Sequence, residues 1–368
     1  MSALANINVR QGFISKYRTK QVLVIALLWT LIDTGVYLFR FFDDYIDNAE
    51  LPYAMQAWVV MILRFVLIFF ICLAMAWLLI YQLKHFIRNL PLWLSLLLKS
   101  IILVIAAFLL NFILHFTYIW LIEKKTLTPE LGISYYRIFQ TSLFVSQMFR
   151  WLIVFLITIL LIEVNEKYSP GVFFDILAGR YITPKIEKRT VMFIDLVDST
   201  AIAEQLGHKK YFRFIRDFIY FISVALLEND GQIYQYVGDE VVVSWIVKKP
   251  NANRKCLQAL LDCKRMLQRN KNYFRKQYGI VPEFRAGIHT GEITIGEIGV
   301  IKKDLAMSGD TMNTAARLRS ATSELNQTVI ISKDFAAQTN LKNWEPISLG
   351  LVDLKGKESA MELYALKL

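Results

Sequence analysis

Two aspartates in the C-terminal half of the chain stand where strands are expected to end. Asp195 follows the apolar run 191–194, and Asp239 lies at the turn of a predicted hairpin over 231–247. An apolar run with β-branched and aromatic members is typical of a buried strand. Two carboxylates on neighbouring strand ends suit hard divalent cations such as Mg²⁺ or Mn²⁺. Either aspartate alone is as readily explained as a helix cap or a turn former.

Two further segments could hold a phosphorylated ligand. Ser199 and Thr200 open a helix after the first aspartate, where backbone N–H groups could receive a phosphate. In the helix predicted over 310–324, Asn313 and Arg317 are four residues apart and therefore share a face. An asparagine can hydrogen-bond a sugar, and an arginine can bind phosphoryl oxygens with two parallel hydrogen bonds. A solvated helix with an incidental arginine is the alternative.

Composition points to a membrane protein. Of the 368 residues, 55% are hydrophobic, and the mean hydropathy of +0.39 is too high for an ordinary soluble chain. The net charge is +11, and the positive residues cluster at the borders of apolar segments. The sequence has no module of interleaved basic and aromatic residues, so we expect a lipid membrane as partner and no nucleic acid. The 3 cysteines are odd in number and lack metal-ligand spacing, which argues against a disulfide framework and a zinc site.

The first half is predicted to be a four-helix membrane domain, residues 21–163, after a cytoplasmic tail, residues 1–20. The apolar runs are long enough to span, and no cleavage motif follows the first, which excludes a signal peptide. Lysines and arginines in the tail and after the second span place both termini and the C-terminal domain in the cytoplasm, at the inner (plasma) membrane. The predicted spans cover roughly 21–39, 57–82, 96–122 and 139–162.

Ionisable residues inside these spans are costly and need a partner. Asp33 and Arg150 each lie roughly 18 Å from their starting border, and we expect them to pair near the midplane. Asn111 and His115 could join them to bind a ligand, although a pair that only specifies packing is the simpler alternative. Two other cations can be placed near a membrane border, where their heads reach water: Arg64 and Lys99.

A linker, residues 164–189, leads to a C-terminal domain, residues 190–368. The linker is either a passive tether or a segment that transmits rearrangements of the bundle, and its sequence leaves both open. Strands alternating with helices and hairpins predict an α/β sandwich around a mostly antiparallel sheet. The expected elements are a strand (190–196), a helix pair (198–229), the hairpin, a helix (252–278), strands 283–289, 292–298 and 303–307, a helix (310–324), a strand (328–333), a short helix and a terminal hairpin (347–366).

Four motifs in this domain together resemble the catalytic domain of class III nucleotidyl cyclases, over about residues 189–367. They are Phe193-Ile194-Asp195-Leu196, Val237-Gly238-Asp239, Gly287-Ile288-His289-Thr290-Gly291 and Gly309-Asp310-Thr311-Met312-Asn313-Thr314-Ala315-Ala316-Arg317. The resemblance implies a ferredoxin-like α/β (α+β) fold and a head-to-tail homodimer with two composite sites. It also implies metal-dependent conversion of ATP to 3′,5′-cyclic AMP and pyrophosphate.

The resemblance further assigns roles to the motif residues. Asp195 and Asp239, assisted by the Leu196 carbonyl, would hold two Mg²⁺ or Mn²⁺ ions per site. From the other subunit, Asn313 would orient the ribose and Arg317 would stabilise charge on the α-phosphoryl group. The turn with Ser199 and Thr200 would cradle the triphosphate. Lys355 resembles the lysine that reaches the terminal phosphates, with Lys357 as a competitor, and His289 is interpreted as structural.

The positions that would read the base depart from the family pattern. Gln235 stands where lysine or glutamate is usual, and Ala306 stands where aspartate or threonine is frequent, with Asp304 two residues away. Because a glutamine side chain donates and accepts, it could read adenine or guanine. We expect adenine first, then guanine or another base. A catalytically silent cyclase-like receptor or scaffold, and a transporter built on the spans, are the non-enzymatic alternatives.

Overall fold

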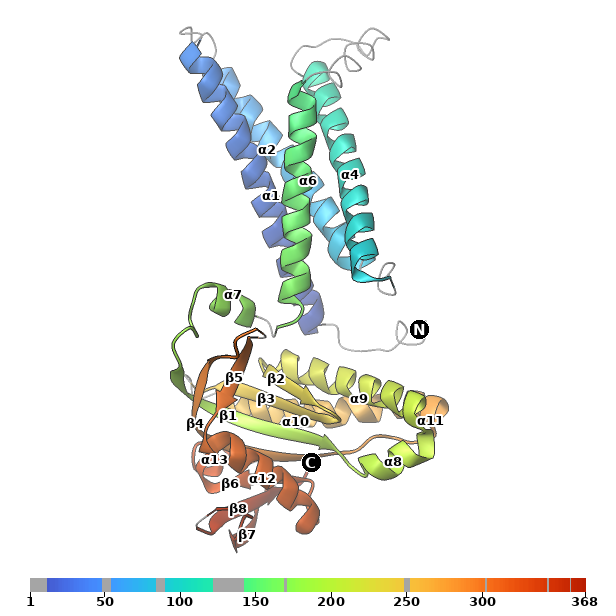
Figure 1. Cartoon of the computed structure of the whole chain (residues 1–368), viewed down its shortest axis with the longest axis vertical. Helices are drawn as coiled ribbons and strands as arrows, with labels where there is room; N and C mark the ends of the chain where they lie inside the picture. The colour runs from blue at the N-terminus through green and yellow to red at the C-terminus, as the bar shows by residue number, and fades with distance from the viewer. Residues whose placement is uncertain are drawn as a thin grey trace. The chain divides into compact units, whose positions relative to one another are not determined.

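The computed structural model describes residues 12–47, 54–83, 90–121, 142–168, 171–247, 252–301, 303–342, 344–357 and 359–368. The chain forms two compact units. One comprises Ser15–Lys167, and the other includes Tyr168–Leu368. The first unit is helical, and the second is built on a β-sheet (Figure 1).

The helical unit contains α1 (Gly12–Asp47), α2 (Ala54–Trp77) with a π-helical continuation (Leu78–Leu83), α4 (Leu92–Leu121) and α6 (Ser142–Asn165). Among the described residues, three helical segments are long and apolar enough to cross a membrane: Ser15–Phe39, Met61–Leu83 and Met148–Asn165. The third predicted span, roughly 96–122, falls on α4, in which the apolar stretch Trp93–Leu109 is shorter. Their shared core includes Trp29, whose ring meets Phe155 edge-on at 4.9 Å between centroids.

The buried charge in this unit has a partner that the sequence analysis did not assign to it. Asp33 accepts two hydrogen bonds from Arg64, from Nε at 3.1 Å and from Nη2 at 2.8 Å. Arg64 is the fourth residue of the apolar segment Met61–Leu83, and the sequence analysis placed it near a membrane border without assigning it to Asp33. The expected pairing of Asp33 with Arg150 stays a prediction. The side chains of Asn111 and His115 lie outside the described residues. Spacing along one helix could not reveal that α1 and α2, neighbours in sequence, bring these two charges to the same level.

The second cation expected at a border is also paired. Lys99 of α4 is 9% exposed and forms an ion pair with Glu163 near the end of α6. A buried lysine needs such a partner because an isolated charge is costly to remove from water.

The second unit is an eight-stranded sheet in which β1 (Lys185–Leu196) is central (Figure 1). The strand order is β2-β3-β1-β4-β6-β8-β7, and β5 pairs with β4 outside this path. All pairings are antiparallel except β4 with β6. The other strands are β2 (Gln232–Val237), β3 (Glu240–Ile246), β4 (Phe284–Ile298), β5 (Asp304–Ser308), β6 (Val329–Ser332), β7 (Ile347–Val352) and β8 (Met361–Leu366). The mixed sheet with helices confirms the expected fold class.

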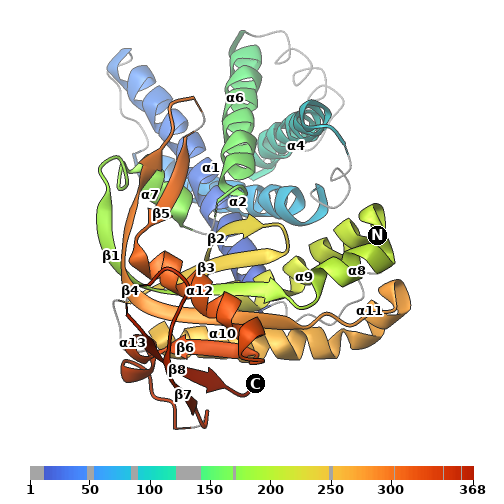
Figure 2. The ribbon, with the colours of Figure 1, turned by 60° about the horizontal axis from the view of Figure 1, so that its bottom comes forward.

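Alternation along β1 divides the domain into two packed layers. Met192 and Ile194 belong to the larger core on one face, which α9 and α10 cover, whereas Val191 and Phe193 pack with α12 on the other (Figure 2). Because side chains alternate along a strand, Asp195 falls on the α12 face. The helices are α7 (Val172–Leu177), α8 (Ser199–Leu206), α9 (His208–Glu228), α10 (Ala252–Arg269), α11 (Lys271–Tyr278), α12 (Asp310–Glu324) and α13 (Lys333–Ala337).

Two boundaries differ from the sequence prediction. The strands expected over 283–289 and 292–298 form the single strand β4, and β1 begins at Lys185, five residues before the expected start at 190. Gly291 does not make a turn: a Cβ there would lie 2.4 Å from Thr311 Oγ1 of α12. At Gly287 a Cβ would lie 2.1 Å from the Arg319 backbone nitrogen. These glycines therefore allow α12 to pack closely on β4.

Candidate active site

Asp195 and Asp239 meet at one end of the central strands. Asp195 is the penultimate residue of β1, and Asp239 lies in the tight turn between β2 and β3. Burial raises the pKa of Asp195 above its ordinary value, and the charge of Asp239 raises it further. Asp239 Oδ2 is buried without a hydrogen-bond partner. The two carboxylates therefore form an electronegative site that lacks a complete set of partners.

Arg319, which the sequence analysis missed, adjoins these carboxylates. Its Nη1 lies 3.3 Å from Asp195 Oδ2, and its Nε lies 2.6 Å from Glu240 Oε2. The second contact lacks hydrogen-bond geometry, since both atoms are buried without a hydrogen-bond partner. Burial raises the pKa of Glu240, and Arg319 offsets part of this rise. Helical spacing could have shown only that Arg319 does not share a face with Arg317.

The donors at this site fit a hard divalent cation. Mg²⁺ in phosphate-handling sites is held by one or two carboxylates together with waters and substrate oxygens. Asp195 and Asp239 supply those carboxylates, and Asp239 Oδ2 has an unused acceptor position. Among the described residues no group of three or more His, Cys, Asp or Glu forms a metal cage. The two aspartates thus suit ions that arrive with a phosphorylated substrate better than a structural metal.

The segment after Asp195 places helix α8 beside the aspartates. Ser199 begins α8, and Asp198 stands at its N-cap with a left-handed backbone (φ 54°) and no side-chain cap hydrogen bond. The Asp198 side chain therefore leaves the first-turn N–H groups of α8 without a capping acceptor. Thr200 is exposed. Burial and the charge of Asp239 raise the pKa of Tyr211, which lies against Ser199.

Asn313 and Arg317 lie on a different side of α12 from Arg319. Asn313 is exposed, and the Arg317 guanidinium lies beside Gly356, where a Cβ would be 3.1 Å from Nη2. Residues two apart on a helix differ by about 200°. Since Arg319 contacts Asp195, the face with Asn313 and Arg317 is turned away from the aspartates of the same chain.

The loop at Gly356 carries both candidate lysines. Lys355 is exposed, whereas Lys357 Nζ donates to Asp310 Oδ2 at 2.6 Å. The hydrogen bond from Lys357 lowers the pKa of Asp310. The structure therefore brings Lys355 and Arg317 to one locality, while Lys357 is engaged at the start of α12.

The two base-reading candidates lie on strands that touch. Gln235 is exposed on β2 beside a register irregularity, and Ala306 is half-buried on β5 opposite Gly296. The contact runs through their neighbours: the Met307 backbone nitrogen donates to Tyr234 Oη at 3.2 Å. Strands β2 and β5 thus approach each other, although the described side chains of Gln235 and Ala306 do not hydrogen-bond each other.

His289 is a buried residue of the β4–β6 interior. Its Nδ1 lies 2.7 Å from Ser332 Oγ, and burial lowers its pKa. It is 6% exposed. A neutral imidazole held in this way has a packing role, in agreement with the structural interpretation.

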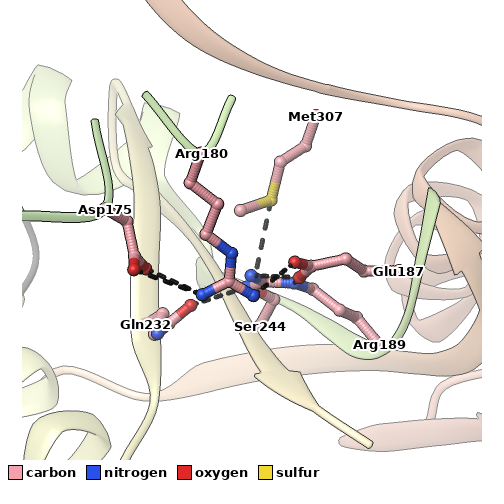
Figure 3. A network of polar contacts seen from close by, with 7 residues as sticks. All are labelled: Asp175, Arg180, Glu187, Arg189, Gln232, Ser244 and Met307. Atoms are coloured by element: carbon pink, nitrogen blue, oxygen red, sulfur yellow. Dashed lines mark hydrogen bonds and ion pairs between the residues drawn. The ribbon is translucent and has the colours of Figure 1, made fainter. Parts of the chain in front are cut away.

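A second polar network joins the linker to the sheet (Figure 3). It reaches the β2–β3 hairpin at Gln232 and Ser244, the strand pair farthest from the turn. Arg189 donates to Glu187 at 2.9 and 2.7 Å, and to Gln232 and Ser244 at 2.6 and 2.9 Å. Arg180 donates to Glu187 at 2.9 Å and to both Asp175 oxygens at 3.2 Å. The chain from α7 to β1 is thereby fixed to the β2–β3 hairpin.

Comparisons with known proteins identify the family of the C-terminal half. The family model "Adenylate and Guanylate cyclase catalytic domain" matches residues 182–368, about half of the chain. Adenylate cyclase 2 of Rhizobium meliloti (strain 1021) is 35% identical over 176 residues, 48% of either chain. The adenylate cyclase of Anabaena cylindrica is 26% identical over 218 residues, 55% of this chain and 42% of the relative. The chain thus spans half or less of these curated relatives.

A solved structure shows the same fold. The structure of a bacterial light-regulated adenylyl cyclase matches with a TM-score of 0.52 and 18% identity, over 62% of this chain and 66% of that chain.

Proposed function

This chain belongs to the family of adenylate and guanylate cyclase catalytic domains, and from this premise we propose that it converts ATP to 3′,5′-cyclic AMP and pyrophosphate. The reaction would take place at composite sites between two copies of the chain. Both curated relatives described above are named adenylate cyclases, which supports adenine as the base.

The geometry of α12 carries the proposal. Arg319 contacts Asp195, and Arg317 lies about 200° further around the helix beside the loop with Lys355. One chain therefore offers a metal-binding half and a separate phosphate-binding half that face different directions. A head-to-tail homodimer would place the Asn313 and Arg317 half of one copy against the aspartates of the other.

Each half would contribute a defined chemical role. Asp195, Asp239 and the Leu196 carbonyl would hold two Mg²⁺ or Mn²⁺ ions, which when bound lower the pKa of the ribose 3′-hydroxyl and neutralise phosphate charge. The first turn of α8, with Ser199 and Thr200, would donate N–H groups to the triphosphate.

The partner half would position the nucleotide for in-line attack. Asn313 would hold the ribose, Arg317 would stabilise charge on the α-phosphoryl group, and Lys355 would bind the terminal phosphates. Gln235 would accept and donate at the base edge beside Ala306.

The apolar helices support attachment to a membrane. We propose four spans with both termini and the catalytic domain in the cytoplasm, where nucleoside triphosphates are available. The linker would carry rearrangements of the bundle to the domain.

A product assay tests the activity. Detergent-solubilised full-length protein receives ATP, GTP, CTP and UTP in parallel, with Mn²⁺ and then Mg²⁺, and products are identified by mass. Cyclic AMP as the main product supports the proposal, and another cyclic nucleotide would overturn only the base. Absence of product from a dimer that binds nucleotide would favour the receptor alternative.

A mixing experiment tests the composite site. Asp195→Ala and Arg317→Ala chains are each expected to be inactive as homodimers. Co-expressed, they should recover part of the activity, because one of the two sites in a mixed dimer is intact. If isolated mixed dimers stay inactive, the shared-site arrangement is wrong.

A further inference from the structure

Arg319 lies at the point where the proposed metal ions would bind. Its guanidinium reaches two carboxylates, 3.3 Å from Asp195 and 2.6 Å from Glu240. Asp195 is one of the proposed metal ligands, whereas Glu240 adjoins the other, Asp239. A side-chain cation therefore shares a carboxylate with the expected divalent cation.

Charge explains why an arginine is retained there. Asp195 and Glu240 both face Arg319 in a partly buried site beside Asp239, and their side chains are only 26% and 13% exposed. Carboxylates this close repel one another, and partial burial weakens solvent screening. Arg319 is the cation recorded at both Asp195 and Glu240, so it offsets part of this repulsion while the site holds no metal ion.

The two contacts of Arg319 differ, and the difference gives a direction of movement. The contact with Glu240 is the shorter and the more buried, whereas the contact with Asp195 is longer and more exposed. Because neither Arg319 Nε nor Glu240 Oε2 has a directed hydrogen bond, their contact is an ion pair that tolerates movement of the guanidinium. Arg319 can therefore release Asp195 and keep its ion pair with Glu240.

We propose that Arg319 is an exchangeable counter-cation that occupies Asp195 until a divalent ion replaces it and that is then retained by Glu240. This inference rests on the proposed function, because it assumes that Asp195 is a metal ligand. It assigns Arg319 a positioning role that sets metal affinity, and it leaves the reacting atoms to the other residues. The site would thus require enough Mg²⁺ or Mn²⁺ to compete with a built-in cation.

The test is Mn²⁺ binding to full-length protein in detergent without nucleotide, measured from the electron paramagnetic resonance signal of free Mn²⁺. Arg319→Met should bind Mn²⁺ about tenfold more tightly than wild type, because the competing cation is gone. Arg319→Lys should fall between them, since it keeps one charge and loses the planar fork. The lysine variant keeps the test valid if the methionine variant fails to fold.

Arg285→Met is the matched control. Arg285 lies on β4 opposite Asp195, but its Nη1 donates to Ser323 Oγ at 2.6 Å. Removing this charge should change Mn²⁺ affinity by less than about twofold. If Arg285→Met tightens binding as much as Arg319→Met does, net charge accounts for the effect and the exchange is wrong.

Thermal unfolding separates exchange from a purely structural role. Arg319→Met should unfold at a lower temperature than wild type without metal and gain more on adding Mn²⁺, because tighter binding adds stability to the folded state. An equal loss with and without Mn²⁺, together with unchanged affinity, would overturn the exchange.

Asp195→Asn distinguishes the exchange from the function on which it rests. Loss of Mn²⁺ binding in Asp195→Asn is the expected result. If Asp195→Asn binds Mn²⁺ as tightly as wild type, the metal assignment fails and the exchange with it. If Asp195→Asn loses binding but Arg319→Met is no tighter than wild type, only the exchange fails.

Discussion

Arg189 and Arg319 of the catalytic domain both contact carboxylates, and their two sites differ in how many of their polar atoms have hydrogen-bond partners. Arg189 is 1% exposed and directs hydrogen bonds to Glu187, Gln232 and Ser244. Around Arg319, the Nε atom, Glu240 Oε2 and Asp239 Oδ2 are all buried without a hydrogen-bond partner.

This contrast separates a structural network from the proposed metal-binding site. A fully satisfied network fixes one arrangement, because each lost bond would leave a buried polar group unpaired. An unsatisfied site costs stability, and that cost is recovered when a ligand supplies the missing partners. The two sites lie at opposite ends of the β2–β3 hairpin. The hairpin can therefore be rigid at the end near Arg189 and able to bind a ligand at the end near Asp239.

Asp239→Asn should have the largest effect on activity and little on stability. Loss of one metal carboxylate is expected to lower kcat by about a thousandfold, since bound metal ions contribute several kcal/mol to such reactions. Amide hydrogen exchange of β2 and β3 should stay within about twofold of wild type. Product formation and exchange are measured on the same preparation. Activity near that of wild type would remove Asp239 from the metal site.

Arg189→Met should have the opposite profile. Breaking a buried ion pair typically costs about 3 kcal/mol or more, so exchange of the β1 and β2 amides should accelerate about a hundredfold. The Mn²⁺ affinity of the folded protein should stay within about twofold. The control is Arg189→Lys, which keeps the charge and should show a smaller acceleration. A large change in Mn²⁺ affinity would mean that the two sites are coupled.

The sequence predicts α12 and the common face of Asn313 and Arg317 well, because local signals define both. Gly309 precedes a helix over the expected residues 310–324, and the spacing of Asn313 and Arg317 fixes their common face. It misplaces β4 because a glycine can signal either a turn or a close approach. Gly291 is the second case, where the neighbour is Thr311 from a distant segment.

Side-chain pairs between distant elements were beyond sequence reasoning. Arg319 meets Asp195 because of the packing angle of α12 on the sheet, which no local pattern encodes. Glu187 and Arg189 alternate at a strand period, but their charges favoured a linker. In the membrane unit, Asp33 was recognised as needing a partner, yet only the packing of α1 on α2 identifies Arg64.

Acid should destabilise the hydrogen-bond network around Arg189 through Glu187. Burial alone would raise the pKa of Glu187, but Arg189 and Arg180 outweigh it and hold the pKa below its usual value. The folded pKa is thus lower than the unfolded one, so this stabilisation is present above about pH 4.3 and is lost as pH falls through the folded pKa. The Tm of wild type should fall more steeply between about pH 5 and 3 than that of Glu187→Gln. Parallel curves would contradict the assignment.

Asp175→Asn should have the smallest effect, because it removes only the contact with Arg180 and leaves the hydrogen bonds of Arg189 in place. Asp175 and Arg180 are about one-third exposed, and pairs of this kind contribute at most about 1 kcal/mol. Glu187 keeps both of its arginine partners in this variant. The amides of α7 should therefore exchange up to about fivefold faster, while those of β1 stay unchanged.

Salt provides the matched control for this smallest effect. Because Asp175 and Arg180 are partly exposed, raising the ionic strength should reduce the difference between Asp175→Asn and wild type at α7. The buried bonds of Arg189 should respond much less, so exchange in β1 should hardly change. If Asp175→Asn accelerates β1 as strongly as α7, the linker is a structural part of the sheet. The difference between the fully hydrogen-bonded network around Arg189 and a loosely attached linker would then disappear.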